Sequence, residues 1–339
     1  MKAFFIDEPG KFSFGEVEKP EVKDGEVLLQ LKRVGYCGSD LNTYRGRNPL
    51  VKYPRIPGHE IGAYVAEIGA GVPEELKVGD LVTVVPYTNC GKCGGCRRNR
   101  LNACENNETL GVQREGTMTE FVSVPYEKVL KLETNDPNLA ALIEPLAVGF
   151  HAASRGKPAF GEKVLIFGCG MVGLGAMLKA VRSGSEVIAV DIDDDKLKLA
   201  KTLGVQHTIN SSIEDLDAKV AELTAGFGPD MVLEAAGVET LFIKAVDLVT
   251  YAGKVVYVGY TKGPVTYETK KFLLKELDIM GSRGSTAVDF QDVIDMVNEG
   301  EFDVTGLITK VVPFEKAGDA IAEWDSNPSA VTKFIIDIG

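Results

Sequence analysis

The sequence predicts a two-domain α/β protein, with a β-rich domain and a second domain built on a doubly wound parallel sheet. Two observations lead to this prediction. The chain has 339 residues, 45% of them hydrophobic, which is more than one ordinary core accommodates. The pattern also changes near Glu144: short apolar segments between glycines and prolines give way to alternating strand and helix patterns.

The first 145 residues predict strands without a long helical period. Residues 27–34 form one candidate strand, and residues 81–85 form another that follows the turn residues Gly79 and Asp80. Frequent glycine and proline between such segments is typical of a partly open antiparallel barrel or sandwich with long loops.

Repeated β-α-β units are predicted from residue 146 onward. A helix over residues 146–155 ends at Gly156 and Pro158. The remaining elements alternate, with strands at 163–167, 186–190, 231–235 and 254–258 and helices at 171–183, 194–203 and 239–250. This alternation is typical of a parallel sheet with helices on both faces.

The tail that begins near Ser282 breaks this alternation. It contains a predicted helix at residues 289–298 and a final strand at 332–338. We expect the tail to pack on the first domain. The expected boundaries are therefore residues 1–145 together with 283–339 for the β-rich domain, and 146–282 for the parallel-sheet domain.

Charge and the N-terminal segment exclude several classes of function. A formal net charge of −12 disfavours non-specific binding to nucleic acid or anionic membranes, because both require clustered Lys and Arg. The apolar run in MKAFFIDEPG is too short for a signal peptide, and no uninterrupted apolar run reaches 18 residues. We therefore expect a cytoplasmic protein with no membrane or nucleic-acid partner.

A glycine-rich turn in LIFGCGMVGLG predicts a dinucleotide site. Gly168, Gly170 and Gly173 form a G-x-G-x-x-G pattern between a predicted strand and a predicted helix, which includes Met171 and Val172. The glycines allow a tight turn, a close approach of backbone to pyrophosphate, and close packing of helix on strand. The alternative is an ordinary strand-to-helix turn. Val258 and Gly259, at the end of another predicted strand, are further candidates for cofactor contact.

The next strand ends in Asp191, at the spacing expected for a carboxylate that binds the adenosine ribose. A carboxylate at this point repels the 2′-phosphate of NADP. No arginine follows, since the next residues are Ile192 and three aspartates. The sequence therefore favours NAD over NADP.

Four cysteines in NCGKCGGCRRNRLNAC predict a structural metal site. Cys90, Cys93, Cys96 and Cys104 have the spacing C-x2-C-x2-C-x7-C, which allows four thiolates to surround one zinc ion and leave no open position. An iron–sulfur cluster is an alternative. Disulfides are disfavoured by the expected cytoplasmic location.

Three separate segments predict a second, reactive metal site. YCGSD contains Cys37, PGHEIG contains His59 and Glu60, and IEPLAV contains Glu144. Their side chains offer sulfur, nitrogen and oxygen ligands suited to zinc. Taken singly, each residue is better explained as a buried thiol, a turn histidine or a carboxylate at a helix start.

Taken together, these segments resemble the zinc-dependent medium-chain dehydrogenases over nearly the whole chain. The cysteine and GHE segments, the four-cysteine loop, EGTMTEFVSV and the G-x-G-x-x-G with its aspartate all occur in the family's order. Glu144 in EPLAVGFHA resembles the sorbitol and polyol branch. The stretch CGSDLNTYRGRNPLVKYPRIPGHE resembles dehydrogenases of sugar acids such as gulonate and galactonate, and galactitol phosphate dehydrogenases.

The resemblance implies a GroES-like catalytic domain, a Rossmann domain, and two zinc ions per chain. Cys37 and His59 would bind the catalytic zinc. Glu60 and Glu144 would complete the site, one directly and the other through water or by ligand exchange, in an order that the sequence leaves open. The remaining implied roles are proton relay for Ser39, orientation of His59 for Asp40, ribose binding for Lys196, and substrate contact for Arg283.

One position departs from the family pattern. Many members carry a histidine three residues after the serine, and it passes the proton to solvent; this sequence has Asn42. An amide does not take up a proton near neutral pH. Water, Tyr44 or Glu144 would then carry the proton outward, and Tyr44 is also a candidate for substrate contact. His151 and His207 are expected to be structural.

The resemblance therefore implies NAD-dependent oxidation of a secondary alcohol on a small polar substrate, a polyol or a sugar acid. Oxidation of threonine or of a simple diol is an alternative within the same chemistry. A catalytically silent NAD- and zinc-binding relative is an alternative of another class. The resemblance also implies a homodimer or homotetramer, with sheet edges pairing near residues 265–268.

Overall fold

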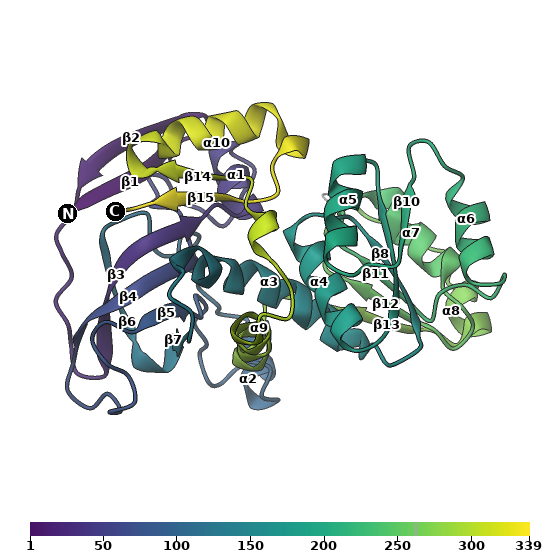
Figure 1. The fold of residues 1–339 in the computed structure, drawn as a ribbon, viewed down its shortest axis with the longest axis horizontal. Helices are drawn as coiled ribbons and strands as arrows, with labels where there is room; N and C mark the ends of the chain where they lie inside the picture. The colour runs from purple at the N-terminus through teal and green to yellow at the C-terminus, as the bar shows by residue number, and fades with distance from the viewer. Residues whose placement is uncertain (262) are drawn as a thin grey trace. The chain divides into compact units, whose positions relative to one another are not determined.

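The computed structural model describes residues 1–261 and 263–339, which form two compact units (Figure 1). Unit 1 comprises Met1–Pro145 and Thr286–Gly339, and unit 2 comprises Leu146–Ser285. These bounds place Arg283 in unit 2. Within the described residues, we find no helix with the length and apolar character needed to cross a bilayer.

Unit 2 contains a six-stranded sheet in which every pair of neighbours is parallel. The strand order is β10-β9-β8-β11-β12-β13. The bounds are β8 (Lys163–Phe167), β9 (Glu186–Asp191), β10 (His207–Asn210), β11 (Met231–Glu234), β12 (Lys254–Tyr257) and β13 (Asp278–Gly281). This order, which reverses direction beside the first strand, is the doubly wound arrangement of dinucleotide-binding domains. The predicted α/β fold class is confirmed.

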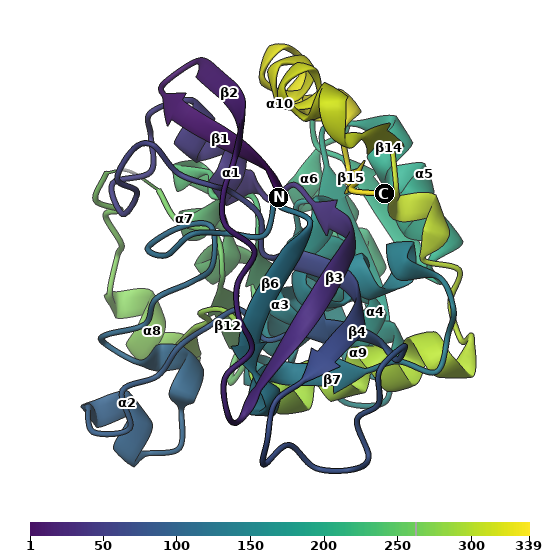
Figure 2. The same cartoon turned by 90° about the vertical axis from the view of Figure 1, so that its left-hand side faces the viewer.

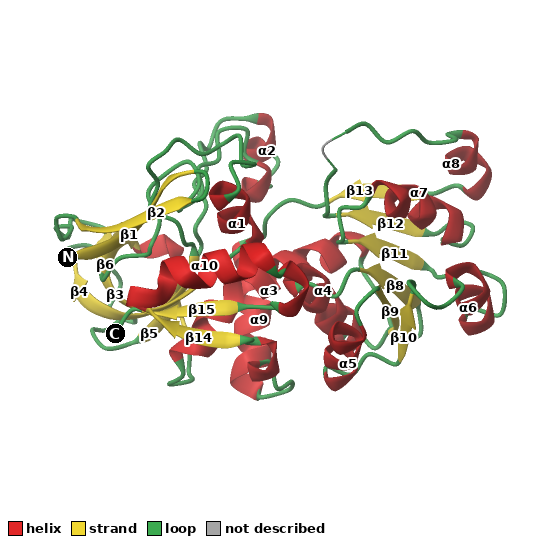
Figure 3. Cartoon of the chain, turned by 90° about the horizontal axis from the view of Figure 1, so that it is seen from above, coloured by secondary structure: helices red, strands yellow, loops and turns green. Residues whose placement is uncertain are grey.

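Helices cover both faces of this sheet, as Figure 3 shows. The helices of this unit are α4 (Met171–Arg182), α5 (Asp194–Thr202), α6 (Leu216–Leu223), α7 (Glu239–Leu248) and α8 (Lys270–Lys275). On one face, Leu165 and Val232 from the strands pack with Val220 of α6 and Ala245 of α7. Strands buried on both faces read as nearly continuous apolar runs, which is why their positions were predictable.

Unit 1 is built on a largely antiparallel sheet in the order β14-β15-β3-β4-β5-β7, with β6 also paired to β3 (Figure 2). Its strands are β3 (Glu26–Gly35), β4 (Glu60–Ile68), β5 (Leu81–Val84), β6 (Phe121–Pro125), β7 (Val129–Lys131), β14 (Lys310–Pro313) and β15 (Phe334–Asp337). A separate hairpin joins β1 (Lys2–Glu8) and β2 (Lys11–Glu16). The C-terminal strand β15 pairs with β3, so the two ends of the chain share this unit.

The α-helices that lie wholly within unit 1 have between 4 and 13 residues. They are α1 (Gly38–Tyr44), α2 (Gly94–Arg97), α9 (Ala287–Glu299) and α10 (Ala317–Ser326). Helix α9 begins at a capping box, in which Thr286 accepts from the backbone N–H of Asp289 and the Asp289 carboxylate accepts from Thr286.

Helix α3 corrects one sequence-based expectation. It spans Pro137–Gly156 and therefore begins nine residues before the predicted start at Leu146. Pro145 lies inside it, although proline removes an intrahelical hydrogen bond and usually marks a boundary. Burial outweighs this local preference, because Leu142, Ile143 and Leu146 are fully buried. Glu144 consequently projects from the interior of a helix.

Candidate active site and metal centres

The first candidate centre lies where strand β3 ends beside the start of strand β4. Gly35 pairs with Glu60 across the antiparallel ladder, which brings Cys37 and His59 to the same end of the two strands. Ligand atoms of Cys37, His59 and Glu60 all lie within 4.8 Å of one another. Gly35 leaves room for this arrangement, because a Cβ there would lie 2.1 Å from Glu60 Oε2.

The Asp40 carboxylate fixes the two backbone segments that carry Cys37 and His59. It accepts from the backbone N–H of Cys37 at 2.9 Å and from that of Gly58 at 3.3 Å. Asp40 is fully buried, and burial raises the pKa of its carboxyl group. The hydrogen bonds thus fix the chain next to His59, whereas the imidazole Nδ1 has no partner among the described residues.

Glu60 is held by a lysine that sequence reasoning missed. Lys333 Nζ donates to both carboxylate oxygens of Glu60, at 2.6 Å and 2.5 Å, and also to the carbonyl of Tyr36 at 2.8 Å. The side chains of Lys333 and Glu60 are 3% and 0% exposed. The two residues lie 273 positions apart, so no local pattern could have paired them.

Glu144 lies outside the group of three and has a different partner. The hydroxyl of Tyr87 donates a hydrogen bond to Glu144 Oε1. Glu144 is buried, and burial raises the pKa of its carboxyl group, which the neighbouring His59 opposes. Tyr87 is a second residue that sequence reasoning missed.

The electrostatics of this centre favour a cation. Burial by itself lowers the pKa of His59, but neighbouring acidic side chains outweigh burial and raise that pKa well above its ordinary value. The largest opposing contribution comes from Cys37, and the carboxyl groups of Asp40 and Glu144 add to it. A buried set of sulfur, nitrogen and carboxylate donors with surplus negative charge fits zinc.

Helix α1 carries Ser39, which is the expected proton relay, Asn42, which replaces the usual relay histidine, and Tyr44. Ser39 Oγ is buried and has no hydrogen-bond partner among the described residues. Asn42 is partly exposed. Tyr44 is 8% exposed and belongs to the hydrophobic core of unit 1.

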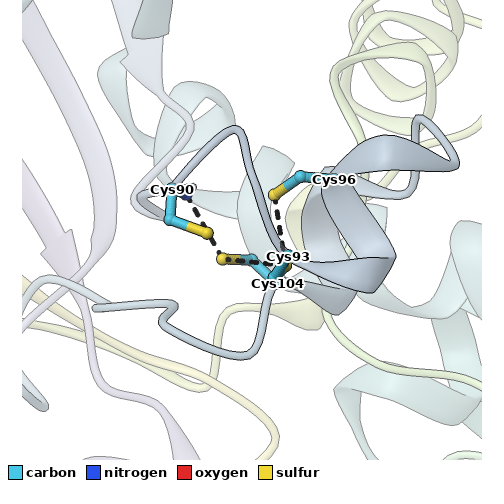
Figure 4. Close-up of side chains that lie close together, drawn as sticks. All are labelled: Cys90, Cys93, Cys96 and Cys104. Atoms are coloured by element: carbon cyan, nitrogen blue, oxygen red, sulfur yellow. Dashed lines mark hydrogen bonds between the residues drawn. The ribbon is translucent and has the colours of Figure 1, made fainter.

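The second candidate centre is the four-cysteine loop, shown in Figure 4. Cys93 Sγ lies 3.5 Å from Cys96 Sγ and 3.8 Å from Cys104 Sγ. All four cysteines are free thiols, and these separations are well beyond the length of about 2.05 Å of a disulfide bond. They match the spacing of about 3.8 Å between sulfurs in a zinc tetrahedron with bonds of about 2.3 Å.

The electrostatics of the four-cysteine loop also favour a bound cation. Hydrogen bonding, first from the backbone of Lys92, lowers the pKa of Cys90 to about 6. Burial and the neighbouring thiols raise the pKa of Cys96 to about 11. Four thiolates so close together are stable only with a bound positive ion, and a zinc ion held by these four residues would supply that charge.

The glycine loop of unit 2 meets the steric demands of a pyrophosphate site. Gly168 has a φ of 93°, which favours glycine. A Cβ on Gly173 would lie 1.8 Å from the carbonyl of Gly168, so this position requires close packing. A Cβ on Gly170, the N-cap of α4, would meet nothing within 4 Å, which leaves open space before the N-terminus of a helix that begins with Met171 and Val172.

Asp191 ends strand β9 beside this loop. One carboxylate oxygen accepts from the backbone N–H of Cys169 at 2.7 Å, and the other accepts from that of Ile192 at 2.7 Å. Lys196 lies two residues into helix α5, whose N-cap is Asp193. The carboxylate is therefore oriented at the end of β9 next to the glycine turn.

A buried carboxylate, Glu234, ends strand β11 on the same edge of the sheet and was missed by sequence reasoning. Its Oε1 accepts from the backbone N–H groups of Ala236 and Gly237, at 2.9 Å and 2.7 Å. Its Oε2 is buried without a hydrogen-bond partner among the described residues. Gly259 is glycine for a steric reason, since a Cβ there would lie 2.4 Å from this Oε2. Val258 and Gly259 both donate their backbone N–H groups to the Glu234 carbonyl.

Arg283 is exposed and follows strand β13 by two residues.

This chain combines a cluster of sulfur, nitrogen and oxygen donors, a loop with four thiols, and a parallel sheet of the dinucleotide-binding type. Together these features define a class of zinc-dependent dehydrogenases. Residues 23–134 match the model of the alcohol dehydrogenase GroES-like domain, and residues 172–299 match that of the zinc-binding dehydrogenases. The chain belongs to this family of zinc-binding dehydrogenases and is an oxidoreductase.

Two curated relatives align over nearly the whole chain. L-Galactonate-5-dehydrogenase of Escherichia coli K12 is 34% identical and covers 93% of this chain and 92% of its own. Sorbitol dehydrogenase of Halalkalibacterium halodurans is 33% identical and covers 98% and 96%.

Solved structures give the same fold. An alcohol dehydrogenase (rspB) of Escherichia coli CFT073, complexed with NADH, has a TM-score of 0.92 at 32% identity and covers 100% of this chain and 99% of its own. Galactitol-1-phosphate dehydrogenase of Escherichia coli has a TM-score of 0.91 at 29% identity, with full coverage of both chains. A zinc-binding dehydrogenase of Sinorhizobium meliloti 1021, bound to NADP, has a TM-score of 0.92 at 28% identity and covers 99% of both chains.

Proposed function

We propose that this enzyme is an NAD-dependent dehydrogenase that oxidises a secondary hydroxyl of a polyol or sugar acid to the ketone. The observation that carries the proposal is the convergence of Cys37, His59 and Glu60 at the end of two paired strands. L-Galactonate-5-dehydrogenase and sorbitol dehydrogenase, which this chain matches over 92% and 96% of their lengths, support the substrate class.

In the proposed centre, Cys37, His59 and Glu60 hold the catalytic zinc directly. Glu60 is favoured over Glu144 for this role because it belongs to the group within 4.8 Å, and Glu144 would act through water. When bound, zinc supplies Lewis-acid polarisation of the substrate hydroxyl. Asp40 keeps the two ligand-bearing segments in register through its hydrogen bonds to Cys37 and Gly58.

Ser39 is the proposed first acceptor of the substrate's proton. Its hydroxyl is buried without a partner among the described residues, so it is able to accept one hydrogen bond and donate another. Asn42 interrupts the usual relay because an amide holds no transferable proton, and water is proposed to carry the proton outward. The dinucleotide accepts the hydride.

NAD is proposed as the preferred dinucleotide. Asp191 places a carboxylate beside the glycine turn, where it would bind ribose hydroxyls and repel a 2′-phosphate. Lys196 would assist it on the ribose, and Met171, Val172, Val258 and Gly259 would line the cofactor. The relative bound to NADP makes this preference a point to test.

A second zinc ion is proposed in the loop formed by Cys90, Cys93, Cys96 and Cys104, where four ligands leave no position for substrate. Thiolate ligands must stay reduced, so a cytoplasmic location is part of the proposal. A homodimer or homotetramer and a substrate contact by Arg283 are also proposed, on the family resemblance alone.

The test combines metal analysis with kinetics on the whole enzyme. Zinc per chain is measured for wild type, Cys37→Ser and Cys104→Ser, together with reduction of NAD and NADP by sugar acids, polyols, a vicinal diol and L-threonine. We expect about two zinc ions in wild type and about one in each variant, with activity lost in Cys37→Ser.

The outcomes separate the candidate functions. A best rate with L-threonine or a simple diol would replace the proposed substrate class. Wild-type zinc near one, unchanged by Cys37→Ser, together with NADH binding but no turnover, would identify a silent relative instead.

A further inference from the structure

The loop formed by residues 109–116 carries a half-buried arginine, Arg114, that the proposed mechanism does not use. Residues 109–116 pack with their backbone against the segment that precedes His59. A Cβ on Gly111 would lie 2.7 Å from the nitrogen of Gly58, and a Cβ on Gly116 would lie 2.3 Å from the carbonyl of Pro57. This loop therefore forms part of the wall around the proposed catalytic centre.

The loop is also tied to Glu144. Thr109 forms a β-bridge with Tyr87, whose hydroxyl donates to the Glu144 carboxylate. Arg114 forms a bridge with Leu110 and donates its backbone N–H to the carbonyl of Thr109. The segment that carries Arg114 is thus connected to Glu144 through Thr109 and Tyr87.

The residues on either side of Arg114, Gln113 and Glu115, hold the loop in place through hydrogen bonds. Gln113 Oε1 accepts from the backbone N–H of Thr109 at 2.8 Å. Glu115 accepts from Arg55 at 2.6 Å and from the backbone N–H of Ile56 at 2.8 Å. The Nε of Arg114, by contrast, is buried without a hydrogen-bond partner among the described residues.

A second cation, Lys128, is attached to the same short segment as this loop, because Val85 donates its backbone N–H to the carbonyl of Lys128 and Leu110 donates to the carbonyl of Pro86. Lys128 is half-buried, and its Nζ donates to Asn89 Oδ1 at 3.3 Å. Burial lowers the pKa of Lys128, and the positive charge of Arg114 lowers it further. Burial also lowers the pKa of Arg114, against a smaller opposing effect from Glu108. Two partly desolvated cations that repel each other are unfavourable unless an anion joins them.

We propose that Arg114 and Lys128 form an anion-binding subsite for the carboxylate or phosphate group of the substrate. This inference rests on the proposed function and narrows it to polyol derivatives that carry a negative group. A guanidinium suits both ligands, because its fork of N–H donors matches two oxygens of a carboxylate or a phosphate. The reacting hydroxyl would face the zinc ligands while the charged end of the substrate extends to this loop.

The kinetic test uses substrates matched in carbon skeleton. KM is measured for L-galactonate, galactitol 1-phosphate and galactitol, with wild type, Arg114→Gln, Arg114→Lys and Lys128→Gln. We expect Arg114→Gln to raise the ratio of anionic to neutral KM by about 10- to 100-fold, the range of a hydrogen bond to a charged group. Arg114→Lys should restore part of this loss. The substrate with the larger effect identifies carboxylate or phosphate as the natural group.

Two further arginine variants serve as controls. Arg98→Gln removes an exposed arginine of the four-cysteine loop and should leave the KM ratio unchanged. Arg283→Gln removes the other arginine considered for substrate contact. A change in the KM ratio with Arg283→Gln but not with Arg114→Gln would overturn the proposal. A loss of zinc in Arg114→Gln would overturn it too, because the two cations would then serve the four-cysteine loop and not the substrate.

A binding measurement separates this proposal from the proposed function. Calorimetric titration with inorganic phosphate and with D-gluconate needs no turnover. If the wild type oxidises no polyol or sugar acid but binds these anions, and Arg114→Gln does not, the subsite stands while the proposed function fails. If the wild type oxidises galactitol as efficiently as the anionic substrates and binds neither anion, the subsite fails while the proposed function stands.

Discussion

Lys333 and Glu60 form an ion pair with almost no access to water, in which one ammonium group contacts both oxygens of the carboxylate. Such a pair is expensive to break, because removing one partner leaves the other charge buried and alone. Its position makes it the natural link between the C-terminal strand β15 and the proposed zinc ligands.

Replacing Lys333 by methionine is expected to lower the free energy of unfolding by about 3–5 kcal/mol in zinc-free protein. The loss should be smaller in zinc-loaded protein, because the metal ion then offers Glu60 a positive partner. Urea unfolding with and without chelator measures both values. Lys310→Met, which breaks an exposed pair with Glu323, is the control and should cost less than about 1 kcal/mol. Equal losses for the two variants would contradict the assignment.

Ser39→Ala should lower kcat by about 10²- to 10⁴-fold if the hydroxyl takes the first proton. Ser39→Thr keeps a hydroxyl and should recover part of the rate. The NADH dissociation constant of each variant, measured by fluorescence, checks that the loss lies in the chemical step. Full activity in Ser39→Ala would remove the serine from the proposed relay.

Asp191→Asn removes the negative charge and leaves one oxygen acceptor, where the carboxylate offers one oxygen to the backbone N–H of Cys169 and the other to that of Ile192. We expect kcat/KM for NAD to fall by about tenfold or more, and the preference for NAD over NADP to narrow, because repulsion of the 2′-phosphate is lost. Initial rates with both dinucleotides give the ratio. An unchanged ratio would show that another group selects the dinucleotide.

Glu234 predicts a pH dependence of stability. Burial raises the pKa of this carboxyl group, against the backbone hydrogen bonds of Gly237 and Ala236. The folded state therefore binds the proton more tightly than the unfolded state. Its stabilising contribution is complete below the ordinary glutamate pKa of about 4.3 and is lost as pH rises through the folded pKa.

Glu234→Gln should accordingly gain stability relative to wild type as pH rises from 4 to 8, because the amide never becomes charged. Urea unfolding at several pH values measures the difference. Glu239→Gln, at an exposed position on α7, provides the comparison and should show no such trend. A constant difference between Glu234→Gln and wild type would mean that Glu234 does not titrate in this range.

Parts of the site with local causes could be predicted from the sequence. The four cysteines lie on one short loop, and the glycine turn depends on φ values and close packing among neighbouring residues. The central strands of unit 2, β8, β9, β11 and β12, are largely buried, so their apolar runs marked them directly, whereas the more exposed β13 was not predicted. The helix before Pro145 was misjudged because burial outweighs the local cost of proline.

The sequence by itself determined the α/β class, the family resemblance and the types of donor atom available. Only the tertiary structure decided which donors meet. Cys37 and His59 lie together because β3 and β4 pair in one register, and Lys333 reaches Glu60 because the C-terminal strand returns to β3. The same holds for Tyr87 and Glu144, which are 57 residues apart. Contacts between distant segments depend on chain topology and packing, which local residue patterns do not encode.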